Sequence, residues 1–444
     1  MKKILGIILF LITFTVGAVL ILTAKSNPST LYLLNWGEYI NEDLVAEFEQ
    51  EYNCTVVEEI VTSSETMYQK ITAGTTAYDV AIPGDYMITK LQSEGYLKEL
   101  DVNNPKYENI YGQYETMFTD SLQELRETYM PGLDTYCMPY FWGAYSIIYN
   151  TQHSDVEEVL KSQGFKGFFD RSLYQEDITI GMYNTARWCI SCYMMAQGLN
   201  PNTVPDSEMQ ELLVKTIKAA HFDVWGDDVL KRKTATGSLD MCYTQLGDFF
   251  DALYLALGEG LDINSFNVLV PETTAAFFDG MVIPTTGKEY DLANAFINFM
   301  LDPEHALENA EAIGYCPTLK SVVNMYYEMA QDPTCYYYED ETDPSRNITM
   351  ALFLERYPVY LDPLVNSRDS AGHIDTEKVF MLEPKDADYM TLCETLVNQI
   401  KASADTSSHL GTVICLSVVS SIVIFSGVYI GLTIAKHKKK KEVQ

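Results

Sequence analysis

A single acidic residue, Asp279, interrupts a strongly apolar stretch of the sequence. Ala275–Phe278 precede it, and Met281–Ile283 follow after one glycine. An ionised carboxylate is costly to bury without a partner, because its lost hydration must be replaced by a charge or by hydrogen bonds. The pattern predicts that Asp279 contacts a ligand or forms a structural salt bridge. We favour the ligand, because perturbed carboxylates concentrate at functional sites.

Two short loops combine aromatic and polar residues. Trp36–Tyr39 follows an apolar strand predicted at Leu31–Leu34, and Gly84–Tyr86 follows a strand predicted at Tyr78–Ile82. In parallel sheets, ligands bind beyond the carboxyl ends of the strands. We therefore expect both loops to line one cleft.

Nothing in the sequence supports a nucleophile paired with a base. The six histidines are isolated from candidate nucleophiles, and no glycine-rich phosphate loop follows a strand. Apart from the C-x-x-C at Cys189 and Cys192, no pair of cysteines or histidines has the spacing of zinc ligands. We expect no enzyme activity, no cofactor and no metal.

These residues need a scaffold of alternating strands and helices. Asn41 followed by two acidic residues is typical of a helix start, and the β-branched run Thr55–Val61 predicts the next strand. Further predicted elements are a helix over Ser64–Gly74, strands at Ile178–Gly181, Leu239–Tyr243 and Phe278–Pro284, and helices at Ala186–Gly198 and Leu292–Leu301. This alternation predicts an α/β fold with parallel or mixed sheets and right-handed crossovers.

Both ends of the chain are hydrophobic. Ile4–Thr23 carries no charge and follows two lysines, so it is a signal peptide or an N-terminal anchor. Leu410–Ala435 is followed by a lysine-rich run, which marks a membrane-spanning helix whose basic end is cytoplasmic. We expect the region between the two ends to lie outside the cell membrane.

The formal net charge is −32, and basic residues gather at both ends, so the middle of the chain is more acidic still. Nucleic acid and anionic substrates are poor partners for such a surface. A cationic ligand would be attracted to it, and its rate of encounter would rise. The alternative interpretation is that the acidic surface only keeps an exported protein soluble.

Nine cysteines are scattered along the chain without the dense spacing of a disulfide framework. Cys189 and Cys192 fall inside a predicted helix, beyond the first turn, where a thiolate gains little stabilisation. We expect buried, reduced thiols rather than redox chemistry.

Six blocks resemble the spermidine/putrescine-binding proteins of ABC importers. In the order of that family, they are Leu34–Tyr39, Ser64–Tyr68, Tyr78–Pro83, Met138–Gly143, Phe278–Pro284 and Ile313–Thr318. The resemblance runs from about residue 30 to residue 320. It implies the two-lobe periplasmic-binding-protein fold of type II, with a hinge between the lobes.

The resemblance implies lobe 1 at residues 30–138 and 282–325, and lobe 2 at residues 139–281 and 326–402. An N-terminal segment (1–26), a linker (403–409), a membrane helix (410–435) and a basic cytoplasmic tail (436–444) complete the predicted organisation. The polar stretch Asp332–Thr376 is expected to be an excursion of loops and short helices.

Binding of a polyamine has a simple physical basis. Its ammonium groups need carboxylates, and aromatic faces cover the methylenes while attracting the cations. By resemblance, Asp279 is the ammonium-binding carboxylate. The matching aromatic positions are Trp36, Tyr39, Tyr86, Phe277 and Tyr315, each of which also suits ordinary packing.

The sequence departs from the family at the far end of the ligand. Spermidine binders place two carboxylates at the start of a helix in lobe 2, and the matching positions are Thr185 and Trp188. Gln245 replaces a family tryptophan. The candidates for a second anionic pole are Asp227, Glu38 and Glu383.

These observations predict a membrane-anchored, extracytoplasmic solute-binding component of an ABC importer. It would capture a polyamine, with a putrescine-like diamine favoured over spermidine, and deliver it to permease subunits powered by a cytoplasmic ATPase. Two alternatives remain: a receptor of the same fold for another organic cation such as a quaternary amine, and a sensory ectodomain without a role in transport.

Overall fold

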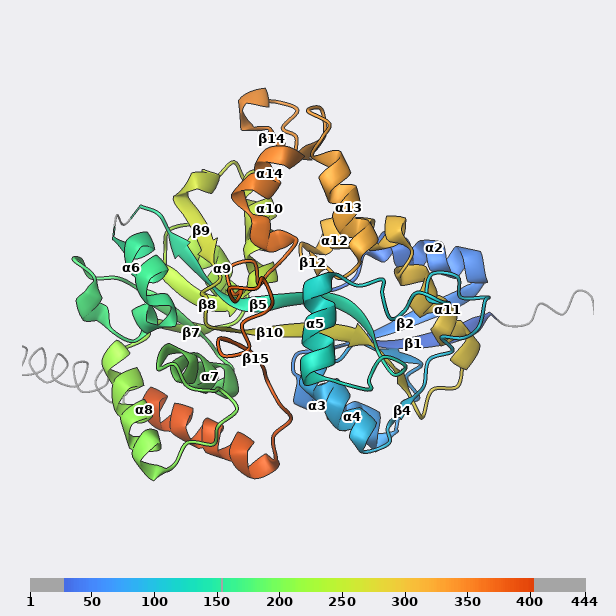
Figure 1. Ribbon diagram of the computed structural model, residues 1–444, viewed down its shortest axis with the longest axis horizontal. Helices are drawn as coiled ribbons and strands as arrows, with labels where there is room; N and C mark the ends of the chain where they lie inside the picture. The colour runs from blue at the N-terminus through green and yellow to red at the C-terminus, as the bar shows by residue number, and fades with distance from the viewer. Residues whose placement is uncertain (1–27, 153–154, 403–444) are drawn as a thin grey trace, which may run out of the picture. The chain divides into compact units, whose positions relative to one another are not determined.

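The computed structural model describes residues 28–152 and 155–402, shown in colour in Figure 1. Packing divides the chain into two compact units, each discontinuous in sequence. Unit 1 comprises the residues up to Ser146, Gln245–Ile263 and Thr274–Pro384; unit 2 comprises Ile147–Thr244, Asn264–Thr273 and the residues from Lys385 onward. This division differs from the predicted lobes. Four stretches that the prediction assigned to lobe 2 pack within unit 1: residues 139–146, 245–263, 274–281 and 326–384.

Unit 1 begins with a parallel sheet in the order β2-β1-β3. The strands are β1 (Ser29–Trp36), β2 (Cys54–Val61) and β3 (Val80–Ala81), and the helices between them are α2 (Glu42–Tyr52) and α3 (Ser64–Ala73). The predicted alternation of strands and helices is confirmed. The third strand, β3, is shorter than the predicted strand Tyr78–Ile82.

The first two helices start where the sequence predicts. The side chain of Asn41 accepts a hydrogen bond from the backbone N–H of Asp43, and Ser63 does the same for Thr66. Such caps satisfy amide donors that the first turn of a helix leaves without a partner. Gly74 ends α3 with a φ of +61°, a left-handed conformation that glycine adopts at little cost. The loops after β1 and β2 therefore lead into capped helix starts.

A second sheet region of unit 1 contains the long strand β5 (Met138–Asn150), which continues into unit 2 after Ser146. β10 (Thr274–Met281) pairs with it in an antiparallel arrangement and with β15 (Val379–Met381) in a parallel one. The register of β10 on β5 shifts between Asp279 and Gly280. A β-bulge of this kind redirects neighbouring side chains, so the candidate carboxylate lies at an irregularity in the sheet.

The remaining elements of unit 1 complete its core. Phe48 of α2 contacts the rings of Phe296 and Phe299 at centroid distances of 5.0 and 5.4 Å, which packs α2 against α11. The other bounds are α4 (Asp85–Ser93), β4 (Leu97–Lys98), α5 (Asp120–Tyr129), α10 (Leu246–Gly258), β11 (Ile283–Pro284), α11 (Tyr290–Met300), α12 (Pro303–Ile313), β12 (Cys316–Pro317) and α13 (Lys320–Met329).

The predicted excursion contains a small hairpin as well as loops and helices. Its elements are β13 (Tyr336–Tyr338), β14 (Ile348–Thr349), α14 (Met350–Arg356) and the 3-10 turns Pro344–Arg346 and Pro358–Tyr360. Phe353 stacks on Tyr337 with a centroid distance of 3.7 Å, and both Phe353 and Tyr360 contact Phe250 of α10. These aromatic contacts explain why the excursion belongs to unit 1.

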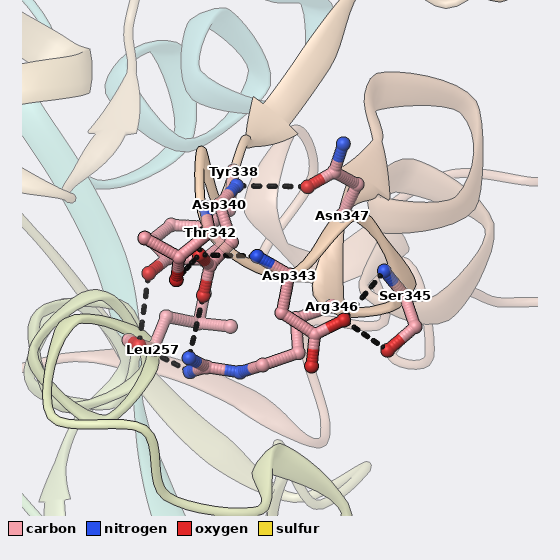
Figure 2. A network of polar contacts seen from close by, with 8 residues as sticks. All are labelled: Leu257, Tyr338, Asp340, Thr342, Asp343, Ser345, Arg346 and Asn347. Carbon is pink, nitrogen blue, oxygen red and sulfur yellow. Dashed lines mark hydrogen bonds and ion pairs between the residues drawn. The ribbon is translucent and has the colours of Figure 1, made fainter.

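Figure 2 shows the polar contacts of residues 338–347, the acidic part of the excursion. The carboxylate of Asp340 accepts hydrogen bonds from the backbone N–H groups of Thr342 and Asp343. It also forms an ion pair with Arg346. Arg346 and Tyr338 both donate to the carbonyl oxygen of Leu257 at the end of α10. The hydroxyl of Thr342 also donates to the Asp340 carboxylate, and this bond, together with those from the two backbone N–H groups, lowers the pKa of the Asp340 carboxyl. The bonds to Leu257 fix this part of the excursion to α10.

Unit 2 contains a parallel sheet in the order β8-β6-β7. Its strands are β6 (Ile180–Tyr183), β7 (Val224–Gly226), β8 (Met241–Gln245) and β9 (Phe266–Leu269), the last paired with the end of β5. Its helices are α6 (Val156–Gln163), α7 (Ala186–Ala196), α8 (Ser207–Ala220) and α9 (Val229–Ala235), with a further helix over 387–402 and 3-10 turns at Gly164–Phe168, Arg171–Leu173 and Ile263–Ser265.

Within the described residues, no helix is both long and apolar enough to cross a membrane. The predicted segments Ile4–Thr23 and Leu410–Ala435, the linker and the basic tail lie outside those residues. The eight cysteines within them are all free, and each is buried except Cys335. The predicted burial is confirmed for seven of the eight, including the C-x-x-C pair, and Cys335 is partly exposed.

Candidate functional site

Asp279 lies near the end of β10 and holds one hydrogen bond through its side chain. The hydroxyl of Tyr39 donates to Oδ2 at 2.7 Å. Gly84 forms an isolated bridge with Asp279, and a Cβ on Gly84 would lie 3.2 Å from Oδ1. The backbone before α4 therefore approaches the carboxyl closely.

Burial raises the pKa of Asp279 from 3.8 to about 7, and the bond from Tyr39 opposes this rise. Part of the residue remains exposed, yet the surrounding atoms exclude enough water to disfavour the charged form. Among the described residues, no lysine, arginine or histidine pairs with Asp279. The structure thus provides no salt-bridge partner for it.

Aromatic rings surround Tyr39 in unit 1. The ring of Tyr315 meets it edge-on at 5.1 Å, and the rings of Tyr140 and Phe141 lie 5.7 and 5.4 Å away. Tyr140 also donates from its hydroxyl to the carbonyl oxygen of Tyr39 and accepts from Asn309. Tyr39 is thereby fixed with its hydroxyl toward Asp279.

Tyr315 links this cluster to the start of α10. Its hydroxyl donates to Oε1 of Gln245 at 3.3 Å, and its ring lies so close to Gly247 that a Cβ there would be 2.3 Å away. Gln245 caps α10 through a reciprocal pair of hydrogen bonds with Asp248. Only a glycine at position 247 leaves room for the ring.

Phe277 is buried on β10, two residues before Asp279, on the same face of the strand because side chains alternate. Its ring packs on Gly143, where an added Cβ would lie 2.9 Å from the ring. The neighbouring ring is that of Tyr145, at 5.9 Å. Phe277 therefore places an apolar surface beside the carboxylate.

Four predicted site residues are thus linked by contacts within unit 1: Tyr39, Gln245, Asp279 and Tyr315. Phe277 shares β10 with Asp279, and its ring lies against Gly143 and Tyr145. The other unit 1 candidates have different surroundings. Trp36 donates from Nε1 to the carbonyl oxygen of Ile82 at 2.8 Å, and the hydroxyl of Tyr86 lies 3.4 Å from the Glu65 carboxylate. Glu38 and Glu383 are exposed. For these four, a role in binding stays a prediction.

The three candidates in unit 2 gather at the carboxyl ends of β6 and β7. Thr185 precedes α7, and Asp227 is an exposed residue directly after β7. The ring of Trp188 lies 4.7 Å from that of Tyr183. Since Tyr183 pairs with Gly226, the loops after the two strands are neighbours.

Sequence reasoning missed the packing residues of the site. Tyr140 and Phe141 were part of a block that resembles the family, but no pattern assigned them to Tyr39. Gly143 and Gly247 carried no signal either, because the need for a glycine arises from rings distant in sequence. In the described part of the chain, no group of three or more histidine, cysteine, aspartate or glutamate side chains is placed to hold a metal ion.

Comparison with known proteins defines the class of this chain. Residues 43–335 match the model of the bacterial extracellular solute-binding protein family. The chain belongs to this family.

Among its relatives is the spermidine/putrescine-binding periplasmic protein of Salmonella typhimurium, 27% identical over 316 residues, which cover 70% of this chain and 84% of that protein. The putrescine-binding periplasmic protein PotF of Escherichia coli is 24% identical over 334 residues, covering 72% and 86%. The structure of the spermidine/putrescine ABC transporter substrate-binding protein PotD of Streptococcus pneumoniae aligns with a TM-score of 0.61 at 26% identity, covering 84% of this chain and 99% of that one. The resemblance seen in the sequence is confirmed.

The raised pKa of Asp279 predicts a pH-dependent cost to the folded state. The folded state favours the protonated carboxyl of Asp279. The contribution of this preference to stability is fully present below pH 3.8 and is lost as the pH rises through about 7. Asp279→Asn, which carries no charge, should therefore unfold with a free energy about 2–4 kcal/mol higher than wild type at pH 8. Urea titrations at several pH values measure this difference, which should fall to less than half by pH 5. A difference between the two proteins that does not change with pH would contradict the raised pKa of Asp279.

The contact of Tyr315 with Gly247 predicts a matched pair of variants in α10. Gly247→Ala forces the ring to move and should lower the free energy of unfolding by about 1–3 kcal/mol. Gly258→Ala, in the same helix with open space around its Cβ, should be neutral or stabilising by up to about 1 kcal/mol. Equal effects of both substitutions in thermal unfolding would show that Tyr315 does not depend on Gly247.

Proposed function

We propose that this protein is the extracytoplasmic binding component of an ABC importer and that its solute is a polyamine. The observation that carries the proposal is Asp279, a carboxylate that no described residue provides with a basic partner, next to the hydroxyl of Tyr39 and its surrounding aromatic rings. Two relatives named as spermidine/putrescine-binding and putrescine-binding proteins support the proposal.

The chemistry of the site suits a primary ammonium group. Alkylammonium groups stay charged at neutral pH, and each N–H can donate to a carboxylate in a charge-assisted hydrogen bond. The cation would also favour the ionised form of Asp279 and lower its pKa. A quaternary amine has no N–H to donate, so it would use the rings of Tyr39, Tyr315 and Phe277 alone. The oxygen acceptor therefore favours a primary amine.

A short diamine is the solute that we favour within the polyamines. One ammonium would bind Asp279, and Asp227, Glu38 or Glu383 would supply the second pole. Thr185 and Trp188 offer no carboxylate to a further ammonium, and an ammonium drawn from water without a partner is destabilised. Putrescine requires two such poles, whereas spermidine has a third charge and a longer chain.

The mechanism that we propose is closure of the two lobes on the solute, followed by docking on permease subunits that a cytoplasmic ATPase powers. The protein binds and hands over the solute without catalysis. The hydrophobic segments near both ends would hold it at the cell membrane, which keeps it close to the permease and raises its effective concentration there.

Removing the charge of Asp279 tests the proposed function. Asp279→Asn preserves shape, so its affinity for putrescine, measured by calorimetry at pH 8, should fall by about 1.5–3 kcal/mol. Glu127→Gln, on the exposed face of α5, is the control and should bind like wild type. Wild-type protein that is folded and binds neither putrescine nor spermidine would refute the polyamine assignment.

The membrane topology has its own test. Protease added to intact cells should remove the region between Ile4–Thr23 and Leu410–Ala435, because we expect it to face outward. A fragment that ends in the intact lysine-rich tail should remain with the cells. Protection of the middle region would reverse the proposed orientation.

A further inference from the structure

The amide of Asn309 is buried against the loop between β1 and α2, which carries Tyr39. Asn309 belongs to α12 and is 2% exposed. Its Oδ1 accepts a hydrogen bond from the backbone N–H of Asn41 at 2.9 Å, and its Nδ2 donates to the hydroxyl of Tyr140 at 2.8 Å. That hydroxyl in turn donates to the carbonyl oxygen of Tyr39 at 2.9 Å. All four residues belong to unit 1, and a side chain of α12 thus holds the loop at two points.

The chemistry of the amide fixes the direction of these bonds. The backbone N–H of Asn41 can only donate, so the atom of Asn309 that faces it is the oxygen Oδ1. The amide nitrogen then faces Tyr140 and donates to its hydroxyl oxygen, which leaves the hydroxyl hydrogen for the carbonyl oxygen of Tyr39. A side chain that lacks either the acceptor or the donor cannot replace Asn309 in this arrangement.

The loop contains a backbone conformation that has to be held in place. Glu38 has a φ of +54°, in the left-handed region that residues other than glycine rarely adopt. Before Glu38, Nε1 of Trp36 donates to the carbonyl oxygen of Ile82 and fixes that side of the loop. After Glu38, the loop turns the hydroxyl of Tyr39 to the carboxylate of Asp279. This second side depends on the two bonds that lead to α12.

We propose that Asn309 is a positioning residue of the binding site, which keeps the hydroxyl of Tyr39 on the carboxylate of Asp279 by holding the loop from behind. Loss of the amide would let the loop relax and would weaken the bond between Tyr39 and Asp279. The inference rests on the proposed function in that this carboxylate accepts an ammonium group. The hold on Tyr39 itself can be measured without a solute.

The titration of Asp279 reports the bond from Tyr39. Burial raises the pKa of Asp279, and the bond from Tyr39 lowers it. When this bond weakens, the pKa should rise above its wild-type value. Other titratable groups close to the pair are the Cys137 thiol, the Asp85 carboxylate and the Tyr315 hydroxyl. The variants described below leave these three groups unchanged.

Asn309→Leu and Tyr140→Phe test the inference. Asn309→Leu preserves the approximate size of the side chain and removes both bonds, and Tyr140→Phe keeps the ring and removes the hydroxyl. Titration of the Asp279 carboxyl by NMR, in the full chain without a solute, should give a higher pKa in both variants than in wild type. Tyr39→Phe removes the bond to the carboxylate itself and sets the largest shift, of which Asn309→Leu should reach at least half.

Asn294→Leu is the matched control. Asn294 is a buried amide of α11, 1% exposed, whose Oδ1 accepts from the backbone N–H of Asp101 at 2.8 Å. Its substitution should cost stability as Asn309→Leu does, yet leave the pKa of Asp279 at the wild-type value. Equal pKa values in the two folded leucine variants would overturn the inference. If Asn309→Leu does not fold, Tyr140→Phe decides, and a wild-type pKa in that variant would overturn it as well.

The affinity for putrescine separates the inference from the proposed function. Only the ionised carboxylate binds an ammonium group well, so the apparent affinity falls with the ionised fraction. Asn309→Leu should therefore bind putrescine about threefold more weakly than wild type, or weaker still, at pH 6.5, and the difference should shrink to less than about twofold at pH 9. Equal weakening at both pH values would reject the positioning role. If the pKa shifts as expected and neither protein binds putrescine, the positioning role stands and the proposed function fails.

Discussion

Unit 1 has to satisfy one constraint above all: the Asp279 carboxyl is largely buried, and no residue in the described part of the chain gives it a cationic partner. The side chain has one hydrogen bond, from Tyr39, and burial shifts its pKa to about 7. A carboxyl in this condition is stable only if its surroundings are rigid, because any loosening would admit water and restore the charge. The rings of Tyr140, Phe141 and Tyr315 supply that rigidity by holding Tyr39 from three sides.

Glycines make the close packing around the carboxyl possible. Gly84 admits the backbone before α4, Gly143 admits the ring of Phe277, and Gly247 admits the ring of Tyr315. Gly280, beside the bulge in β10, lies against the sulfur of Cys137, where any Cβ would clash. The site therefore depends on these glycines as well as on its side chains. Even a methyl group added at one of them should disturb the packing around the carboxylate.

Local patterns made much of the first sheet predictable. The apolar run before Trp36, the cap at Asn41 and the glycine at position 74 carry their structural meaning within a few residues, so β1, α2 and α3 lie where the sequence placed them. Long-range packing was not readable in this way. Three contacts join residues 68 or more positions apart: Tyr315 with Gly247, Phe353 of the excursion with Phe250 of α10, and Lys401 with Trp225. Asp279 was found because a charge in an apolar strand is a local anomaly; its bond to Tyr39 was not.

The interleaving of the two units governs the order in which the protein can assemble. Unit 1 receives its strand β15 from Val379–Met381, and unit 2 receives the helix over 387–402. During synthesis and export, each unit therefore waits for nearly the last of the described residues before its sheet or its helical layer is complete. The early sheet β2-β1-β3 and the apolar strand β5 must persist meanwhile with partners missing. A chain interrupted anywhere between Ser146 and Pro384 would leave both units unfinished, so truncated products should be targets for proteolysis rather than half-active receptors.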